Sequence, residues 1–324
     1  MKERYIADLK VKEEIVDFFM AKSVAIKTGS NGKEYLDLIL GDTTGEVSAK
    51  KWNISPTEND KFKEIKDGDI VKVKAQVKEW NGTKQLDIGL IRVAEEADQV
   101  DRSQFIKCAP IPTEEMYQYM VDTCQAFEDQ QLKSLCMKAL EDNREKLLYW
   151  PAASKNHHAE YGGLLYHMKR MLDNGKAMCT VYGDLLNRDL LLCGVILHDM
   201  EKINEIESDE NGFSSGYSFE GQLLGHIVQG VKTIEKNCQE LGVDEEKKIM
   251  LEHMILSHHY EPEFGSPKRP LFPEAEILHY LDIIDARMYD FEEGLRNVEP
   301  GEFSERVWTL DNRRLYKNKF GGNQ

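Results

Sequence analysis

The sequence predicts two domains in one chain, an all-β barrel at the N-terminus followed by an all-α helical domain. The 324 residues are enough for two hydrophobic cores, and 41% apolar with 31% charged residues is ordinary for a globular protein. Residues 15–93 contain short β-type runs separated by turn signals, whereas residues 113–294 contain apolar repeats of helical period. We therefore expect domains at residues 1–93 and 113–324, with the polar segment 94–112 as a linker.

The first domain is expected to contain five strands. Their ranges are 15–27, 34–40, 46–53, 70–80 and 86–93. Asn81-Gly82 separates the last two, and this dipeptide favours a tight hairpin because both residues tolerate positive φ. Five strands in so short a segment indicate a small closed sheet, and their order resembles an OB-fold.

OB-folds bind single strands by stacking bases on exposed aromatic side chains while lysines follow the phosphates. Tyr35 and Trp52 are the substrate-binding candidates in this domain, and Trp80 is a further exposed aromatic candidate. The alternative is that the aromatic side chains fill the barrel and the lysines protect sheet edges. Taken alone, the barrel fits a protein-binding module equally well.

The second domain is expected to be helical. Thr113, followed by two glutamates, is typical of an N-cap with favourable charge in the first turn. Helical patterning continues to Trp150. Further helices are expected at about 160–181, 186–200, 221–241, 245–258 and 274–294. Residues 208–218, rich in glycine, serine and acidic residues, are expected to form a mobile loop.

The net charge of −16 argues against a protein that coats nucleic acid non-specifically, because such binding depends on lysines and arginines that displace counterions. No apolar run approaches the roughly 20 residues needed to cross a bilayer, and the first residues lack a signal-peptide core. The six cysteines contain no Cys-x-x-Cys pair and are expected to be buried thiols in a reducing compartment. We therefore expect a cytoplasmic protein that makes no membrane contact.

Histidines and aspartates recur along the helical domain in an order suited to metal ligation. The apolar run 190–197 ends at His198-Asp199, a pair that is costly to bury unless a cation compensates it. A lone buried histidine is more often a hydrogen-bonded core residue. Here the pair has companions on or beside other predicted helices, namely His167, His226, His258, His259, Asp282 and Asp285. Imidazole and carboxylate ligands suit Mn²⁺, Fe²⁺, Co²⁺ or Zn²⁺ better than Mg²⁺.

Longer motifs surround these residues. They are His157-His158-Ala159-Glu160-Tyr161-Gly162-Gly163-Leu164, His198-Asp199-x-x-Lys202, Glu220-Gly221-x-Leu223-Leu224-Gly225-His226, Ser257-His258-His259 and Gly265-Ser266-Pro267-Lys268. The order resembles the HD superfamily of metal-dependent phosphohydrolases, and within it the YhaM-type 3′-to-5′ exoribonucleases of Gram-positive bacteria. The similarity extends from the barrel to Asp311-Asn312-Arg313, which is nearly the whole chain.

The resemblance implies an enzyme that releases 5′-mononucleotides from the 3′ end of single-stranded RNA, and also of DNA. It implies one divalent metal held by His167, His198, Asp199 and Asp282, and a second held by His226 and His258, with Asp199 bridging the two. Manganese is the first choice, with cobalt, iron, zinc or magnesium as alternatives. Two ions about 3.5–4 Å apart can stabilise the attacking and leaving oxygens of a phosphoryl displacement. Asp199 and Lys202 are the expected catalytic residues.

Other candidates carry two interpretations each. His158 is expected to contact substrate, and the alternative is an exposed loop residue. His259 is expected to contact phosphate, or alternatively a carboxylate behind the metal ligands. Lys268 is a candidate phosphate contact, although most surface cations are only solvated.

Two positions leave the assignment open. Asp285 follows Asp282 by three residues and could exchange roles with it; we favour Asp282 as the ligand and Asp285 for orienting a ligand or pairing with Arg287. Relatives usually have glycine before the lysine of the His-Asp motif, whereas this chain has Glu201. A carboxylate there could crowd the turn, pair with Lys202 or repel phosphate.

Two other functions remain open from the sequence. The first is an HD phosphohydrolase that acts on nucleotides or cyclic dinucleotides, with the barrel serving another purpose. The second is a nucleic-acid-binding protein whose metal site has decayed. Glu201, in place of the usual glycine, is the residue that would indicate such a loss. The sequence leaves the number of chains in the assembly open, with a homo-oligomer as one option.

Overall fold

The structure is a computed structural model that describes residues 2–29, 32–52, 54–80, 82–101, 104–154, 158–210 and 212–320. The chain divides into two units, residues 1–108 and 109–324, and each has its own hydrophobic core. The segment expected to be the linker, 94–112, is shared between them. Phe105 is buried in the first unit beneath the Lys2 ammonium, and the Ala109 N–H donates to the Tyr161 carbonyl in the second.

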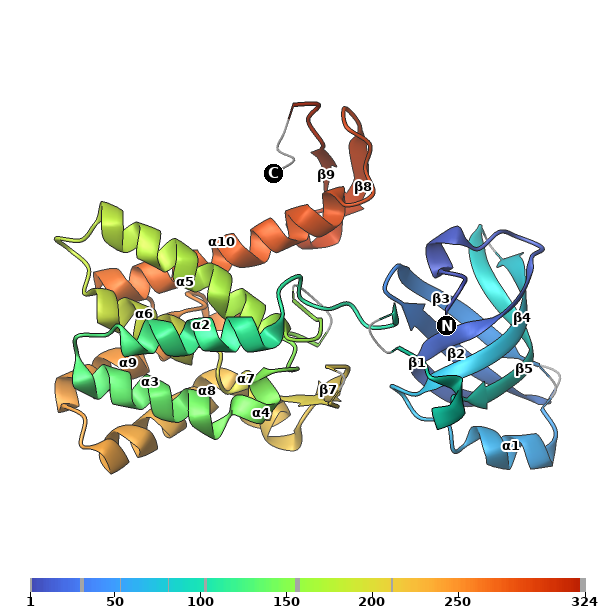
Figure 1. The fold of residues 1–324 in the computed structure, drawn as a ribbon, viewed down its shortest axis with the longest axis horizontal. Coiled ribbons are helices and arrows are strands. Elements are labelled where there is room, and N and C mark those ends of the chain that lie inside the picture. Colours follow the sequence, from blue (N-terminus) through green and yellow to red (C-terminus); the bar gives the residue numbers. More distant parts are fainter. Residues whose placement is uncertain are drawn as a thin grey trace. The chain divides into compact units, whose positions relative to one another are not determined.

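The first unit is a closed barrel with strand order β1-β2-β3-β5-β4 (Figure 1). Its strands are β1 (Glu14–Thr28), β2 (Glu34–Asp42), β3 (Gly45–Lys51), β4 (Ile70–Trp80) and β5 (Thr83–Val93). All neighbours are antiparallel except β3 and β5, which close the barrel in parallel. Alternating apolar residues face inward, as Leu36, Leu38 and Leu40 of β2 do. The predicted N-terminal barrel is therefore confirmed.

Short segments complete this unit. A single turn of 3-10 helix, η1 (Ile6–Asp8), precedes β1, and α1 (Pro56–Phe62) joins β3 to β4. The Ser55 hydroxyl caps α1 by accepting from the Glu58 N–H. Trp80 pairs with Thr83 across the tight connection between β4 and β5, where Gly82 has a φ of 78°. The Asn81 half of the predicted turn lies outside the described residues.

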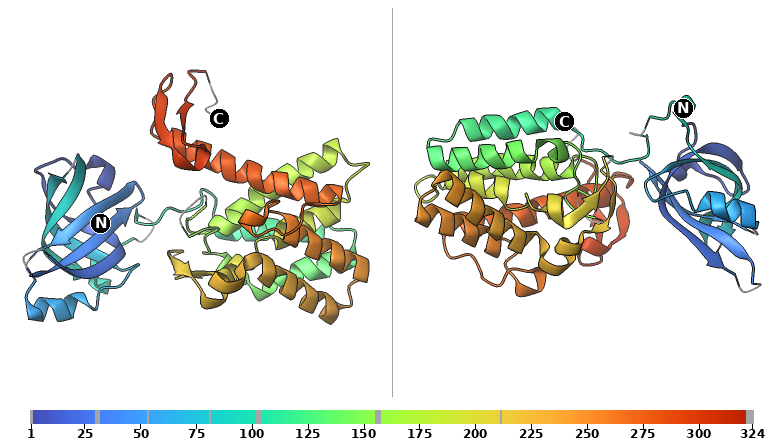
Figure 2. Two further views of the ribbon diagram at one scale, coloured as in Figure 1. Left: turned by 180° about the vertical axis from the view of Figure 1, so that it is seen from behind. Right: turned by 90° about the horizontal axis from the view of Figure 1, so that it is seen from below.

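The second unit is a helical bundle (Figures 1 and 2). Its helices are α2 (Thr113–Gln125), α3 (Gln130–Asp142), α4 (Arg144–Leu147), α5 (Gly163–Val181), α6 (Arg188–Leu197), α7 (Lys202–Glu205), α8 (Phe219–Leu241), α9 (Glu245–Ser257) and α10 (Pro273–Leu295). The apolar α6 is buried along nearly its whole length between α5, α9 and α10. None of the helices in the described ranges is long and apolar enough to cross a membrane.

The structure differs from the sequence prediction at three places in this unit. Thr113 is the first helical residue of α2, and Pro112 takes the cap position without a side-chain hydrogen bond. The segment expected as a loop at 208–218 contributes to a small antiparallel pair, β6 (Ile206–Ser208) with β7 (Ser214–Tyr217). A second pair, β8 (Phe303–Val307) with β9 (Arg313–Tyr316), follows α10. Within its described residues, the helical unit therefore carries two strand pairs, β6–β7 and β8–β9.

Candidate metal centre

Four histidines of the helical unit use Nδ1 for a positioning hydrogen bond and turn Nε2 toward a common centre. The Nδ1 atoms of His198, His258, His226 and His167 lie 2.8 Å from Val195 O, 2.7 Å from Ile255 O, 2.9 Å from Glu205 Oε2 and 2.7 Å from Asp285 Oδ2, respectively. Carbonyl and carboxylate oxygens accept hydrogen bonds, so each Nδ1 donates, and Nε2 is the atom that can offer a lone pair to a metal when the ring is neutral. Nitrogen atoms prepared in this way are typical metal ligands.

The first group of ligand atoms combines α5, the end of α6 and α10. His167 Nε2 lies 3.3 Å from His198 Nε2, 3.4 Å from Asp282 Oδ1 and 3.6 Å from Asp199 Oδ2. His198 Nε2 lies 3.4 Å from the same Asp199 oxygen. Residues from three separate helical segments therefore converge, and they could hold one metal ion.

The second group shares Asp199 with the first. The other oxygen of this carboxylate, Oδ1, lies 3.4 Å from His226 Nε2 and 3.9 Å from His258 Nε2. Ligand atoms of His226, His258 and His259 lie within 4.8 Å of one another. His259, which we expected to contact phosphate, thus sits among the residues that could hold a second metal ion. Asp199 directs one oxygen at each group.

Unsatisfied polar atoms at the centre fit a cation. Among the described residues, Asp199 Oδ1, His226 Nε2 and His258 Nε2 are buried and have no hydrogen-bond partner. Three buried acceptors that face one another are costly unless something positive lies among them. This donor set of imidazoles and carboxylates fits a divalent transition metal.

Lys202 pairs with the shared carboxylate. Its Nζ lies 2.7 Å from Asp199 Oδ2, three residues earlier in the chain. Burial would raise the pKa of Asp199, but Lys202 and His198 lower it well below its usual value. Burial in turn lowers the pKa of Lys202, and Asp199 raises it above its usual value. The centre thus keeps an ionised carboxylate beside a charged ammonium.

Glu201 points away from this arrangement. Its Oε2 accepts a 2.6 Å hydrogen bond from Asn204 Nδ2, and the residue is buried. Its backbone, with φ −76° and ψ −2°, is open to any residue, so the turn does not require glycine. Of the three alternatives for Glu201, the structure does not show the pairing with Lys202, because Lys202 pairs with Asp199.

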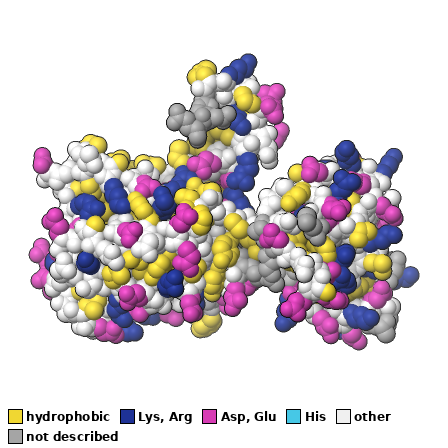
Figure 3. Space-filling model, viewed as in Figure 1, with side chains coloured by type: hydrophobic (Ala, Val, Ile, Leu, Met, Phe, Trp, Pro, Cys, Tyr) yellow, Lys and Arg dark blue, Asp and Glu magenta, His cyan; other side chains and the backbone are white. Residues whose placement is uncertain are grey.

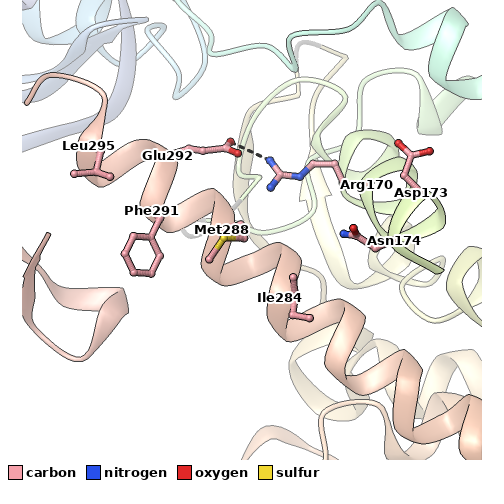
Figure 4. A pocket seen from close by; sticks show the side chains of 8 residues that line it. All are labelled: Arg170, Asp173, Asn174, Ile284, Met288, Phe291, Glu292 and Leu295. Carbon is pink, nitrogen blue, oxygen red and sulfur yellow. Dashed lines mark hydrogen bonds and ion pairs between the residues drawn. The ribbon is translucent and has the colours of Figure 1, made fainter. Parts of the chain in front are cut away.

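Asp285 lies behind the first group and holds it in place. Its Oδ2 accepts from His167 Nδ1 at 2.7 Å, and its Oδ1 lies 2.5 Å from Arg170 Nε. Arg170 extends from α5 to pair with Glu292 of α10 at 2.9 Å, beside an open pocket of about 510 Å³ (Figure 4). The cationic partner of Asp285 is therefore Arg170 and not Arg287, which pairs with a distant aspartate instead.

His158 also belongs behind the ligands. It is completely buried, its Nε2 donates to Asp285 Oδ2 at 2.8 Å, and its ring packs 4.1 Å from that of Tyr289. A side chain enclosed in this way does not contact substrate, so the expectation of substrate binding is corrected to a positioning contact. His157, the preceding residue of the motif, lies outside the described residues.

Two features of the second group escaped the sequence reasoning. Glu205 accepts from both Nδ1 and the backbone N–H of His226, at 2.9 and 3.1 Å. That N–H is available because Gly225, with φ 69° and ψ 164°, interrupts α8 immediately before His226. A side chain at residue 225 would be strained at this positive φ. The glycine in the quoted motif was the only signal, and it did not identify Glu205.

The other substrate-binding candidates lie outside the centre. In the barrel, the rings of Tyr35 and Trp52 pack 4.7 Å apart, and Lys50 Nζ lies about 5.5 Å from both. Trp52 is 45% exposed, so its ring is not buried in the barrel core. Lys268 is exposed on the loop before α10. It lies near His253, whose pKa is lowered by burial and further by Lys268.

Comparisons with known proteins agree with both units. Residues 164–287 match the HD domain model, and residues 20–94 match the model of the OB-fold nucleic acid binding domain. A 3′-5′ exoribonuclease YhaM from Geobacillus sp. is 41% identical over 97% of this chain and 95% of its own length. The chain belongs to the YhaM family of 3′-5′ exoribonucleases.

A second relative supports the same assignment. The YhaM of Halalkalibacterium halodurans is 39% identical over 98% of this chain and 97% of its own length. Membership of the YhaM family makes the chain a metal-dependent nuclease of the HD class with an OB-fold. An HD domain implies a divalent metal, and the histidine and aspartate groups described above could bind it.

Proposed function

We propose that this chain removes 5′-mononucleotides from the 3′ end of single-stranded RNA, and also of DNA. The observation that carries the proposal is the Asp199 carboxylate, which directs one oxygen at each of two imidazole groups. Sites that hold two cations around a shared carboxylate suit the in-line displacement of a phosphodiester. HD phosphohydrolysis of nucleotides or cyclic dinucleotides is not favoured, because both close relatives are exoribonucleases.

Each ligand has a specific place in the proposal. His167, His198, Asp199 and Asp282 would hold the first cation, and His226, His258 and His259 would hold the second with Asp199. When bound, the cations supply an activated water and offset the charge of the scissile phosphate. The mixed imidazole and carboxylate set favours Mn²⁺, with Co²⁺, Fe²⁺ or Zn²⁺ ahead of Mg²⁺.

Lys202 and Asp285 would serve the reaction in different ways. The Lys202 ammonium, held beside Asp199 and mostly buried, is placed to neutralise an oxygen of the scissile phosphate. Asp285 keeps the His167 ring oriented so that Nε2 faces the centre. Asp199 and Lys202 are therefore proposed to be catalytic, and Asp285 is a positioning residue.

The barrel would hold the strand. The exposed Trp52 ring, its Tyr35 neighbour and the Lys50 ammonium offer a stacking surface with a cation at its edge. Base stacking on such aromatics contributes about 1–3 kcal/mol per base and tolerates any sequence. Lys268 is proposed to guide phosphates at the helical unit, on which it is exposed.

The test is degradation of a 5′-labelled single-stranded RNA in the presence of EDTA, Mn²⁺, Co²⁺ or Mg²⁺. A ladder that shortens from the 3′ end with release of 5′-mononucleotides supports the proposal, and turnover restricted to free nucleotides contradicts it. His198→Ala should abolish turnover while strand binding remains. His253→Ala is the matched control, because this histidine lies on α9 outside the centre.

The proposal also covers location and assembly. All six cysteines are without disulfides in the structure, which favours the reducing cytoplasm. Self-association remains a prediction, and light scattering of the purified protein measures it directly.

A further inference from the structure

The β8–β9 hairpin is fixed to α10 through its aliphatic side chains. Leu310 and Leu315 are buried, and Val307 and Leu315 pack over Gly294. A β-carbon at Gly294 would lie 2.8 Å from both neighbours, so glycine permits this close approach. The hairpin therefore has a defined position at the C-terminal end of α10 (Figures 1 and 2).

The turn of the hairpin, η5 (Trp308–Leu310), packs against α10. Directly after this turn, Asp311 Oδ2 lies 3.1 Å from Arg287 Nη2 of α10. Arg287 follows Asp282 by five residues on the same helix, a rise of about 7.5 Å at 1.5 Å per residue. The turn is therefore attached to the helix that carries Asp282.

The hairpin presents aromatic rings to solvent. Trp308 is 78% exposed, and Phe303 and Tyr316 are about half exposed with their rings 5.1 Å apart. Trp308 in particular leaves most of its surface to solvent. Exposed rings on a fixed support are suited to stacking with planar partners.

The same surface carries guanidinium charge. Arg306 Nη1 donates to the Asn312 carbonyl, and Arg314 Nε donates to the Ser304 carbonyl. In the described part of the chain, neither arginine has a carboxylate within 4 Å. Residues 301–320 contain five Lys or Arg and three Asp or Glu, in a chain whose net charge is −16. Basic and hydrophobic side chains are visible together on the hairpin in Figure 3.

We propose that the β8–β9 hairpin is a second strand-binding surface, which stacks bases on Trp308 and contacts phosphates with Arg306 and Arg314. This inference rests on the proposed function: a 3′-end nuclease places the terminal nucleotide at the cations, so the nucleotides on the 5′ side lead away from them. The hairpin, which packs on the helix that carries Asp282, takes those nucleotides. It thereby holds the shortening strand at the catalytic unit itself.

A second copy of the chain is the competing occupant, because aromatic and arginine side chains are also enriched at protein interfaces. Two observations favour the nucleic-acid strand. The turn η5 is attached to the helix that carries Asp282, and Arg306 and Arg314 have no carboxylate partner among the described residues. A polyanion gains from such cations through the release of counterions.

The experiment measures binding of the full-length protein in EDTA to a fluorescent single-stranded oligo(A) of about 12 nucleotides. Trp308→Ala should weaken binding about 5- to 100-fold, the loss expected for one stacked base. The slope of log K against log salt concentration measures the number of phosphate contacts. Arg306→Gln and Arg314→Gln should each reduce the magnitude of this slope by about 0.7. Tyr182→Ala is the control. It removes an exposed aromatic ring at the C-terminal end of α5 and should leave the affinity for oligo(A) unchanged.

Two further readouts separate the outcomes. Hydrolysis of a ribodinucleotide, too short to reach the hairpin, should be the same in Trp308→Ala and in the unsubstituted protein. If neither protein hydrolyses any RNA, the proposed function fails while the binding result stands. Unchanged oligo(A) affinity in Trp308→Ala would overturn the inference. A Trp308→Ala protein with a different number of chains per particle from the unsubstituted protein would also overturn it, because a second copy would then be the occupant. Trp308 is mostly exposed, so thermal melting should confirm an intact fold.

Discussion

Replacing Asp285 with asparagine tests whether the carboxylate behind His167 prepares the metal site. Asp285 Oδ2 accepts from His167 Nδ1 at 2.7 Å and from His158 Nε2 at 2.8 Å, while Oδ1 faces Arg170 Nε at 2.5 Å. Asparagine keeps the size of the side chain but removes its charge. One of its two polar atoms is also an amide nitrogen, which cannot accept these hydrogen bonds.

The expected loss is in metal affinity. Removing a partner that orients a ligand histidine typically weakens metal binding 10- to 100-fold, or about 1.4–2.7 kcal/mol. The Asp285→Asn protein should therefore bind Mn²⁺ more weakly by this factor. Arg170→Gln should cause a smaller loss, because it acts on His167 only through Asp285 and leaves the carboxylate in place.

The assay is calorimetric titration of the metal-free protein with Mn²⁺. Asp173→Asn is the matched control, because this aspartate lies on the same helix as His167 but pairs with Lys169 at the surface. An Asp285→Asn protein that binds Mn²⁺ within twofold of the unsubstituted protein would refute the reasoning. A loss of equal size in the control would also refute it.

Three other perturbations follow from the geometry. Glu201→Gly should leave nuclease activity unchanged, because the carboxylate faces Asn204. It should lower the free energy of unfolding by about 1 kcal/mol in a denaturant titration. A loss of activity would mean that Glu201 serves the reaction. Removal of residues 1–108 should preserve hydrolysis of short oligomers and weaken binding of long ones, and equal affinity for long strands would exclude a platform role for the barrel. Burial lowers the pKa of His167, but hydrogen bonds to Asp282 and Asp285 raise it to about 10. A metal must displace that proton, so apparent Mn²⁺ affinity should rise up to about tenfold per pH unit below pH 10, and a flat profile would count against this.

The sequence was sufficient for most of the secondary structure because its patterns are local. Residues 70–80 were expected as a strand and form β4, and residues 245–258 were expected as a helix and form α9 to within one residue. The β6–β7 and β8–β9 pairs were missed, since each strand is short and depends on pairing with a segment several residues away. Periodicity carries little information at such lengths.

In the candidate site too, some residues could be predicted from the sequence and others could not. Ligand residues were recognisable because imidazole and carboxylate types recur in a family order, and the structure brings His167, His198 and Asp282 together. Residues behind the ligands were not recognisable from the sequence. Arg170 and Glu205 are ordinary charged residues in sequence, and their roles arise only from contacts made across the fold. The burial of His158 likewise depends on packing against α10.

The interruption of α8 at Gly225 has a consequence for how the centre is loaded. His167 and Asp282 project from unbroken stretches of α5 and α10, whereas His226 follows the break and His258 and His259 follow the last residue of α9. Helix breaks and ends open locally at lower cost than packed helical interiors. If two ions bind as proposed, we expect them to exchange at different speeds, with the ion on the His226 side leaving first. When free metal is scarce, an enzyme that has lost this ion would be inactive. Its activity would therefore follow the concentration of free metal around it.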